Sequence, residues 1–240
     1  TRFLPVVMGA PVRYPEGATA DPYRFVVEMA ERARRRGVAV RTGAAVTRVL
    51  VRGGRAEGVE LESGEVVAAD VVILAAGAYT VRLTGPLGIR LPLQAAKGYH
   101  RDYRPGAGVP AVRTGCILGE ASVFCAELGG YVRFAGTLEF SGLDERMRRS
   151  RLEQLTVAAR RFLDGMGGAA PSSEWCGLRP CLPDGLPAVG PAPGIAGLLI
   201  ATGHAMMGLT LGPVTGRVVA EYVLDGAPAA DLRMLRADRF

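Results

Sequence analysis

The clearest helical pattern in the chain follows Asp21. Apolar side chains recur there at the three- and four-residue spacing of one helix face. Asp21 is a good N-cap, Pro22 suits the first helical position, and Gly37 supplies the stop. The pattern predicts an amphipathic helix that ends in the arginine run 32–36. Its apolar stripe consists of Phe25, Val26, Met29, Ala30 and Ala33.

After Gly37 the apolar period changes to that of strands. Gly53-Gly54 and Ser63-Gly64 are turn signals within this region. The segment 71–75 is entirely apolar, which is typical of a parallel strand that is buried on both faces. Strands are predicted at 38–41, 45–52, 55–61, 66–69 and 71–75.

The middle of the chain has short strand-like runs joined by Gly-rich turns, which predict a mostly antiparallel sheet. These runs are 91–93, 98–103, 111–113, 122–126 and 131–138. A surface helix is expected at 144–163, with Met147, Leu152, Leu155, Ala159 and Phe162 as its apolar positions. A buried strand at 198–201 and a helix at about 210–224 complete the pattern. The expected fold class is therefore α/β, with an α/β part built from both ends and an antiparallel insert between them.

Composition narrows the class of protein. A chain of 240 residues with 49% hydrophobic residues can bury a sizeable core. The net charge is +6, and among the 29 basic residues only Lys97 is a lysine. Codon bias in a GC-rich genome is the favoured explanation, since no zinc-finger or RNA-binding motif accompanies the charge. An acidic partner or a membrane surface is a weaker alternative.

Cysteine and histidine usage argues against a metal site. The four cysteines form no CxxC pair and only two histidines occur, which excludes an ordinary structural zinc site and favours free thiols in a reducing compartment. The longest charge-free run, 194–214, is interrupted by glycines and prolines. The chain begins at Thr1 without a signal peptide. We expect the C-terminal piece of a longer protein that is cytoplasmic or peripheral at the inner membrane.

Three segments carry candidate chemistry. The first is 71–77, which is either a buried strand whose glycine turn binds a ligand, as α/β sheets do there, or a plain core strand followed by a turn. The second is 177–185, where prolines stiffen the backbone around Arg179. A rigid guanidinium in a neutral stretch suits a carboxylate ligand, although a structural pair with Asp184 is an equal alternative. The third is 201–216, whose glycines recur every four residues. It suits either a flat ligand or close helix–sheet packing.

In this order, the segments resemble the FAD-dependent D-amino acid oxidase superfamily, and within it the bacterial D-amino acid dehydrogenases and the glycine oxidases. The most specific element is Gly177-Leu178-Arg179-Pro180 with Pro183-Asp184-Gly185, followed about twenty residues later by Thr202-Gly203-His204. Further matching stretches are 21–24, 43–49, 69–78, 97–99 and 202–217. The resemblance covers nearly the whole chain, as the C-terminal portion of such a protein.

The resemblance implies a two-domain flavoprotein that oxidises the Cα–N bond of a D-amino acid by hydride transfer to FAD. Residues 1–84 and 190–240 would then be parts of a Rossmann-like FAD-binding domain, and residues 85–189 a substrate-binding domain. Arg179 matches the residue that binds the substrate carboxylate. The cofactor-binding positions that match are Val46, Ala76, Gly77, Gly203, His204, Met207, Gly208 and Leu209. No metal is implied.

The departures from the family are informative. Glycine oxidases carry a tyrosine in the strand that here reads Ser122-Val123-Phe124, and an arginine in the turn that here reads Ala205-Met206-Met207. The stretch Lys97-Gly98-Tyr99 is more similar to the dehydrogenases. The Gly-x-Gly-x-x-Gly phosphate loop occurs nowhere in this sequence. We therefore expect a missing N-terminal segment or a partner subunit to complete the FAD site.

The favoured function is that of a D-amino acid dehydrogenase that passes electrons to a quinone or another membrane-surface acceptor. Its partner is a small amino acid and not a nucleic acid. One alternative is a glycine- or sarcosine-type oxidase that uses oxygen. The other is a non-catalytic fragment or subunit that lacks the nucleotide-binding half.

Overall fold

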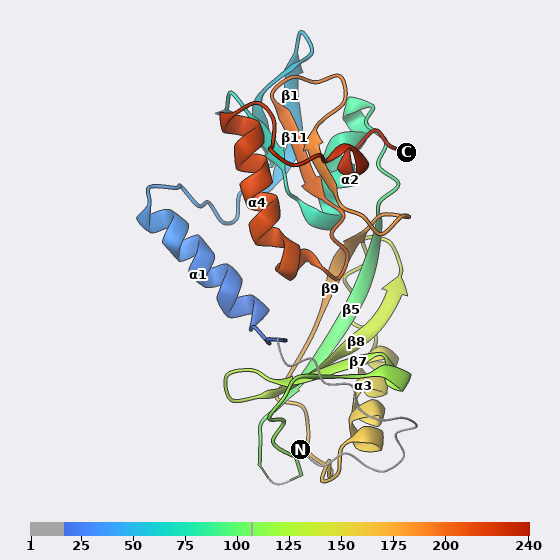
Figure 1. The fold of residues 1–240 in the computed structure, drawn as a ribbon. Coiled ribbons are helices and arrows are strands. Elements are labelled where there is room, and N and C mark those ends of the chain that lie inside the picture. The colour runs from blue at the N-terminus through green and yellow to red at the C-terminus, as the bar shows by residue number, and fades with distance from the viewer. Residues whose placement is uncertain (1–16, 107) are drawn as a thin grey trace. The chain divides into compact units, whose positions relative to one another are not determined.

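The computed structural model describes residues 17–106 and 108–240 (Figure 1). The chain folds into two compact units. Unit 1 contains the described residues up to Val38 together with Lys97–Glu139 and Asp144–Gly177. Unit 2 contains Ala39–Ala96, Phe140–Leu143 and Leu178–Phe240. Assigning these units to FAD binding and substrate binding, with the predicted boundaries, stays a prediction.

Unit 1 begins with the predicted amphipathic helix, α1 (Pro22–Arg35). Its cap forms as expected, because the N–H groups of Tyr23 and Arg24 donate to Asp21 Oδ1 at 3.0 and 3.2 Å. Tyr131 anchors the cap from another element, since its hydroxyl donates to Asp21 Oδ2 at 3.0 Å. No residue of α1 is buried: of the predicted apolar stripe, Phe25, Val26 and Met29 are exposed, and the two alanines are half-buried.

The sheet of unit 1 has five strands in the order β6-β7-β8-β5-β9. The strands are β5 (Gln94–Tyr103), β6 (Cys116–Leu118), β7 (Val123–Glu127), β8 (Val132–Phe140) and β9 (Ser173–Cys181), with β5 and β9 extending into unit 2. The 3-10 turn η3 (Gly119–Ala121) joins β6 to β7. Both the β6–β7 and the β7–β8 pairs are antiparallel, as predicted. Helix α3 (Arg149–Phe162) buries Leu152, Leu155, Ala159 and Phe162 in the same core as Tyr99, Tyr103 and Phe134.

Three predictions for this region are wrong. No strand forms at 91–93 or 111–113, where Pro92 and the preceding Pro110 limit backbone pairing. Helix α3 begins at Arg149 and not at Asp144. The carboxylate of Asp144 accepts the backbone N–H of Arg146 at 3.0 Å, and such a local bond competes with helix formation. Met147 therefore lies outside the helix and is 51% exposed.

Unit 2 contains two three-stranded sheets. One is antiparallel and consists of β1 (Val46–Arg52), β2 (Arg55–Leu61) and β3 (Val66–Ala68). The other has the order β10-β11-β4, with β10 (Ala188–Pro191), β11 (Leu198–Thr202) and β4 (Val72–Leu74). Strand β4 pairs in parallel with β11, as its apolar sequence predicts. Because β4 lies at the sheet edge, its Ile73 is 43% exposed, so the expectation of complete burial is wrong.

Helices complete unit 2. After β4 come η1 (Gly77–Tyr79), α2 (Thr80–Thr84) and η2 (Gly85–Leu87), and near the C-terminus lies η4 (Arg233–Leu235). The long helix α4 (Gly208–Leu224) starts two residues earlier than predicted and packs Val219 against Val189 and Leu199 of the β10–β11 hairpin (Figure 1). No strand forms at 38–41, which the chain uses as a connection to β1. No helix in the described residues is long and apolar enough to cross a membrane.

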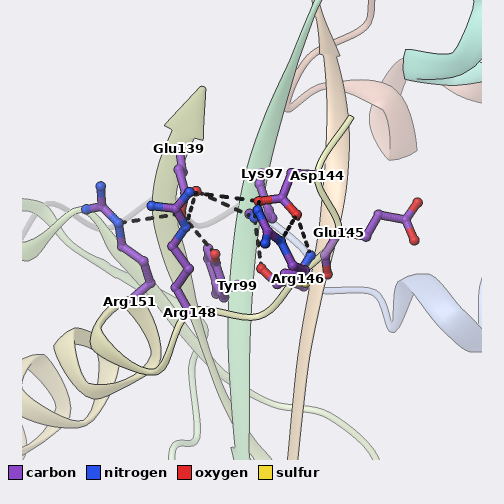
Figure 2. A network of polar contacts seen from close by, with 9 residues as sticks. Lys97, Tyr99, Glu139, Asp144, Glu145, Arg146, Arg148 and Arg151 are labelled. Carbon is purple, nitrogen blue, oxygen red and sulfur yellow. Dashed lines mark hydrogen bonds and ion pairs between the residues drawn. The ribbon is translucent and has the colours of Figure 1, made fainter. Parts of the chain in front are cut away.

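A buried ionic network in unit 1 surrounds Lys97 (Figure 2). The Lys97 side chain is completely buried, and its Nζ donates to the backbone carbonyl of Arg146 at 2.9 Å. The carboxylates of Glu139 and Asp144 each lie 3.5 Å from this nitrogen. Burial alone lowers the pKa of Lys97, but Tyr99 and the two carboxylates outweigh it and raise the pKa.

The network also includes the tyrosine of the Lys97-Gly98-Tyr99 stretch. The Tyr99 hydroxyl donates to Glu139 Oε2 at 2.9 Å, and Arg148 Nε lies 2.9 Å from the other oxygen of the same carboxylate. Figure 2 shows Arg148 and Arg151 pointing toward Glu139 from the start of α3. Lys97 and Tyr99 therefore hold both ends of the segment between β8 and α3, through Glu139 at the first end and Arg146 near the second.

Candidate functional site

The candidate site lies at one edge of the sheet formed by β10, β11 and β4 in unit 2. Because β4 and β11 are adjacent and parallel, their carboxyl ends meet at this edge, which is where open α/β sheets bind ligands. Ala76 and Gly77 follow β4, and Gly203 and His204 follow β11. A hydrogen bond joins the two ends, since Thr202 Oγ1 donates to the Gly77 carbonyl at 2.9 Å. Four of the predicted cofactor positions are thus brought together.

The turn between β11 and α4 has a demanding backbone. Gly203 has φ +85°, and a Cβ atom at this position would collide with the side chain of Leu182. Ala205 has φ +47°, an uncommon conformation for a residue with a side chain. The Ala205 N–H donates to the Pro180 carbonyl at 2.8 Å, and His204 forms an antiparallel bridge with Cys181. The end of β9 therefore holds this turn in place.

His204 occupies a defined position in the turn. A hydrogen bond of 2.9 Å joins its Nε2 to Thr215 Oγ1 on α4. Burial lowers the pKa of His204, and no carboxylate opposes this effect. The ring is therefore neutral at physiological pH. It is better suited to shaping the turn than to acting as a cation.

The start of α4 is open to a ligand. Met207 is the N-cap residue, and its own N–H donates to the His204 carbonyl at 2.8 Å. No side chain of the described residues caps the helix, so the N–H groups that follow Met207 have no capping partner there. Met207 and Leu209 are 50% and 37% exposed. Cβ atoms added at Gly212 and Gly216 would meet nothing within 4 Å. The glycine spacing therefore leaves a flat, uncovered helix face and does not serve close packing among the described residues.

Val46 is the one predicted cofactor position in another sheet. It is the first residue of β1, pairs with Leu61 of β2, and is 37% exposed. It belongs to unit 2, like the other predicted cofactor residues. Its proposed contact with the adenine end of FAD stays a prediction.

Arg179 lies on the part of β9 that belongs to unit 2. Its Nη1 is buried and has no hydrogen-bond partner in the described part of the chain. Burial lowers the pKa of Arg179, and the nearby Cys181 opposes this only in part. A buried guanidinium nitrogen without a partner is costly, so the position favours an anionic ligand.

Arg179 does not form the ion pair with Asp184 that was its alternative role. Asp184, its expected partner, is bound by Arg239, whose Nε and Nη2 lie 2.7 and 3.1 Å from the two carboxylate oxygens. Arg239 also donates to the carbonyls of Leu186 and Arg236, each at 2.8 Å. Sequence reasoning missed Arg239, because no local pattern connects residues that are 55 positions apart.

Two further functional positions were not predicted from the sequence. Thr202 links the two strand ends, and Cys181 bridges to His204. Thr202 could have been found from the sequence, because it is a hydroxyl residue at the end of a buried strand. No signal in the sequence marks Cys181. His100, the other histidine of the chain, has a 14% exposed side chain and stacks on Trp175 with ring centroids 5.2 Å apart.

The arrangement fits one side of a flavin. Uncapped helix N–H groups and the open glycine face suit a flat ring that carries negative charge, and the orphaned Arg179 nitrogen suits a carboxylate beside it. The sequence contains no phosphate loop to hold a pyrophosphate. Within the described residues, no cluster of side chains could hold a metal ion. The fold is thus that of an α/β protein, in which the buried Nη1 of Arg179 and the uncapped start of α4 both favour an anion.

The chain belongs to the DAO family of FAD-dependent oxidoreductases, whose sequence profile matches residues 2–222. It is 34% identical over 230 residues to a D-amino acid dehydrogenase of Xanthobacter autotrophicus, covering 95% of this chain and 54% of that protein. It is 35% identical over 218 residues to a D-amino acid dehydrogenase of Methylobacterium nodulans, covering 90% and 51%. The chain therefore spans about half the length of these relatives.

Solved structures have the same fold. The glycine oxidase of Geobacillus kaustophilus matches with a TM-score of 0.81 and 26% identity, over 89% of this chain and 57% of that one. An iminodiacetate oxidase from Chelativorans sp. BNC1 matches with a TM-score of 0.77 and 27% identity, over 88% and 57%. The predicted family, the α/β flavoprotein fold and the FAD dependence of the family are confirmed.

Proposed function

We propose that this chain is the substrate-facing part of an FAD-dependent oxidoreductase that oxidises the Cα–N bond of a D-amino acid. The observation that carries the proposal is the buried, unpartnered Nη1 of Arg179, on the strand whose end holds the turn between β11 and α4. The names of the relatives support the choice of a D-amino acid dehydrogenase.

Arg179 binds and orients the substrate in this proposal. Its guanidinium forms two parallel, charge-assisted hydrogen bonds to the α-carboxylate, which fix both the position and the rotation of the amino acid. Positioning of this kind lowers the barrier because the reacting carbon is held in one orientation. Because Arg179 is partly buried, water is excluded and the ion pair between its guanidinium and the substrate carboxylate is stronger.

The cofactor residues form the second half of the site. FAD held by these residues would supply the hydride acceptor for the substrate carbon. Ala76 and Gly77 would lie near the dinucleotide, and Gly203, His204 and Met207 would form the turn that meets the ring. Gly208 and Leu209 would offer the N–H groups of the first turn of α4. These groups and the helix dipole stabilise negative charge at the edge. His204 shapes this turn as a neutral ring, and no residue of the chain is assigned as a general base.

The preferred electron acceptor is a quinone or another acceptor at a membrane surface. The Lys97-Gly98-Tyr99 stretch and the absence of the two glycine-oxidase residues support this choice. A second candidate is an oxygen-using oxidase of the glycine or sarcosine type, which the likeness to the glycine oxidase structure favours. Comparing hydrogen peroxide formation with reduction of an artificial quinone separates them. Peroxide formed as fast as quinone is reduced would favour the oxidase.

The test of the proposed function is anaerobic bleaching of flavin absorbance in the FAD-loaded protein that contains this chain. A D-amino acid should bleach the flavin within the mixing time of the assay, whereas its L-enantiomer and the amine left by decarboxylation should bleach it much more slowly. A protein that is yellow but bleached by no amino acid would refute the proposal. A protein that never retains flavin would instead support a non-catalytic role.

A further inference from the structure

Two of the four cysteines face each other in the sheet of unit 1. In the antiparallel pair of β6 and β7, Cys116 lies directly opposite Cys125. Directly opposite residues point to the same face of a sheet, with Cβ atoms roughly 4.5–5.5 Å apart. A disulfide takes Cβ atoms about 3.5–4.5 Å apart, so a small local adjustment of the hairpin is enough.

The surroundings give the two thiols different roles. Cys125 is fully buried, whereas Cys116 is only partly buried. The hydrogen bond that the Cys125 thiol donates to the Cys116 sulfur lowers the pKa of Cys116 and raises that of Cys125. A small reagent therefore meets Cys116 first, as the more acidic and more accessible sulfur.

The remaining two cysteines have other partners. The Cys176 thiol donates to the Glu145 carbonyl at 3.2 Å, and Cys181 lies opposite His204 in a backbone bridge. Neither is in register with another cysteine among the described strand pairs. The 116/125 pair is thus distinguished by its geometry and not by the number of thiols in the chain.

We propose that Cys116 and Cys125 form a peroxide-sensitive dithiol that closes reversibly into a cross-strand disulfide. The Cys116 thiolate attacks one oxygen of hydrogen peroxide, the O–O bond breaks, and a sulfenic acid and one water result. The Cys125 sulfur then attacks the sulfenic sulfur, the S–O bond breaks, and the second water leaves with the remaining thiol proton. Two thiols and one peroxide give one disulfide and two waters. A thiol reductant reverses the change.

Closure of this bond would fix an edge of the sheet. Strand β6 has three residues and lies at the end of the strand order, where its only partner among the described strands is β7. The new ring would enclose η3 and Ser122, a residue with φ +51°. Amide exchange in β6 and β7 should therefore slow on oxidation, while exchange in unit 2 should not change.

The chain offers a direct test by peptide mapping. No lysine or arginine lies between the two cysteines, but Glu120 does. Digestion of alkylated protein with trypsin and a glutamate-specific protease places Cys116 in 114–120 and Cys125 in 121–127. After mild hydrogen peroxide treatment, the two peptides should be linked, with a mass lower by two hydrogen atoms, and a reductant should separate them.

Matched variants keep the outcome decisive. In Cys116→Ser, the Cys125 thiol should survive peroxide at least ~10-fold longer than in the wild type, because the accessible nucleophile is gone. Cys176→Ser should leave the linked peptide unchanged. Recovery of 114–120 as a sulfinic acid with 121–127 unmodified would overturn the proposal. So would linkage of either peptide mainly to Cys176 or Cys181.

Discussion

Replacing Arg179 by methionine tests the proposed carboxylate-binding role of this residue most sharply. The substitution keeps the length and the apolar contacts of the side chain but removes the charge and the planar fork. Among the described residues, the Nη1 of Arg179 is buried without a partner and no ion pair to Arg179 is formed, so the variant leaves none of their carboxylates unpaired. We therefore expect folding stability to be retained or raised, and the loss to fall on substrate binding.

The magnitude follows from the hydrogen bonds that are lost. A bidentate, charge-assisted pair in a partly desolvated pocket contributes about 3 kcal/mol. Since each 1.36 kcal/mol is about a factor of ten, kcat/KM for an amino acid should fall by about two orders of magnitude. The amine lacking the carboxylate should be oxidised about equally well by both proteins. Arg179→Lys should lie between wild type and Arg179→Met, because it keeps the charge alone.

The assay compares kcat/KM for an amino acid and its decarboxylated amine in the FAD-loaded protein. Arg239→Met is the matched control, because Arg239 makes a structural pair with Asp184. It should lower the unfolding midpoint and reduce activity toward both substrates alike. If Arg179→Met gave equal losses on both substrates together with a lower unfolding midpoint, Arg179 would be a structural residue and the reasoning would be refuted.

Three further predictions rest on separate observations. The isolated 240-residue chain should lose FAD during gel filtration because it lacks the phosphate loop, and stoichiometric retention would contradict this. Lys97→Met should lower the free energy of unfolding, measured in urea titrations, by roughly 2–3 kcal/mol. This is less than for an isolated buried ion pair because Arg148 also neutralises Glu139. Arg146→Met is the control and should change the free energy of unfolding little, because the Arg146 side chain is 87% exposed. Burial raises the pKa of Asp102, but hydrogen bonds from Arg133 and Ser173 outweigh it and lower the pKa, so its stabilisation is complete above about pH 3.9 and is lost as the pH falls further. Acid unfolding curves of Asp102→Asn should lose this dependence, and an unchanged acid limb would show that another carboxyl is responsible.

The sequence by itself determined the features that depend on neighbouring residues. The Asp21 cap of α1 depends only on N–H groups two and three residues away. The apolar run of β4 predicts a strand that packs against a hydrophobic core, whichever elements form that core. The Gly177-to-Gly185 element and Thr202-Gly203-His204 identified the family because their residue types and spacing are specific. These signals are local, so a linear reading finds them.

The tertiary structure decided everything that depends on a distant partner. A strand needs another strand, so the strand-like segments 38–41 and 111–113 remain connections. Two arginines of similar sequence character have different surroundings: the fold brings Arg239 to Asp184, whereas the Nη1 of Arg179 has no partner among the described residues. Whether an arginine is structural or binds a ligand depends on which charged groups the fold places within about 4 Å of its guanidinium. The residues next to the arginine in the sequence do not determine this.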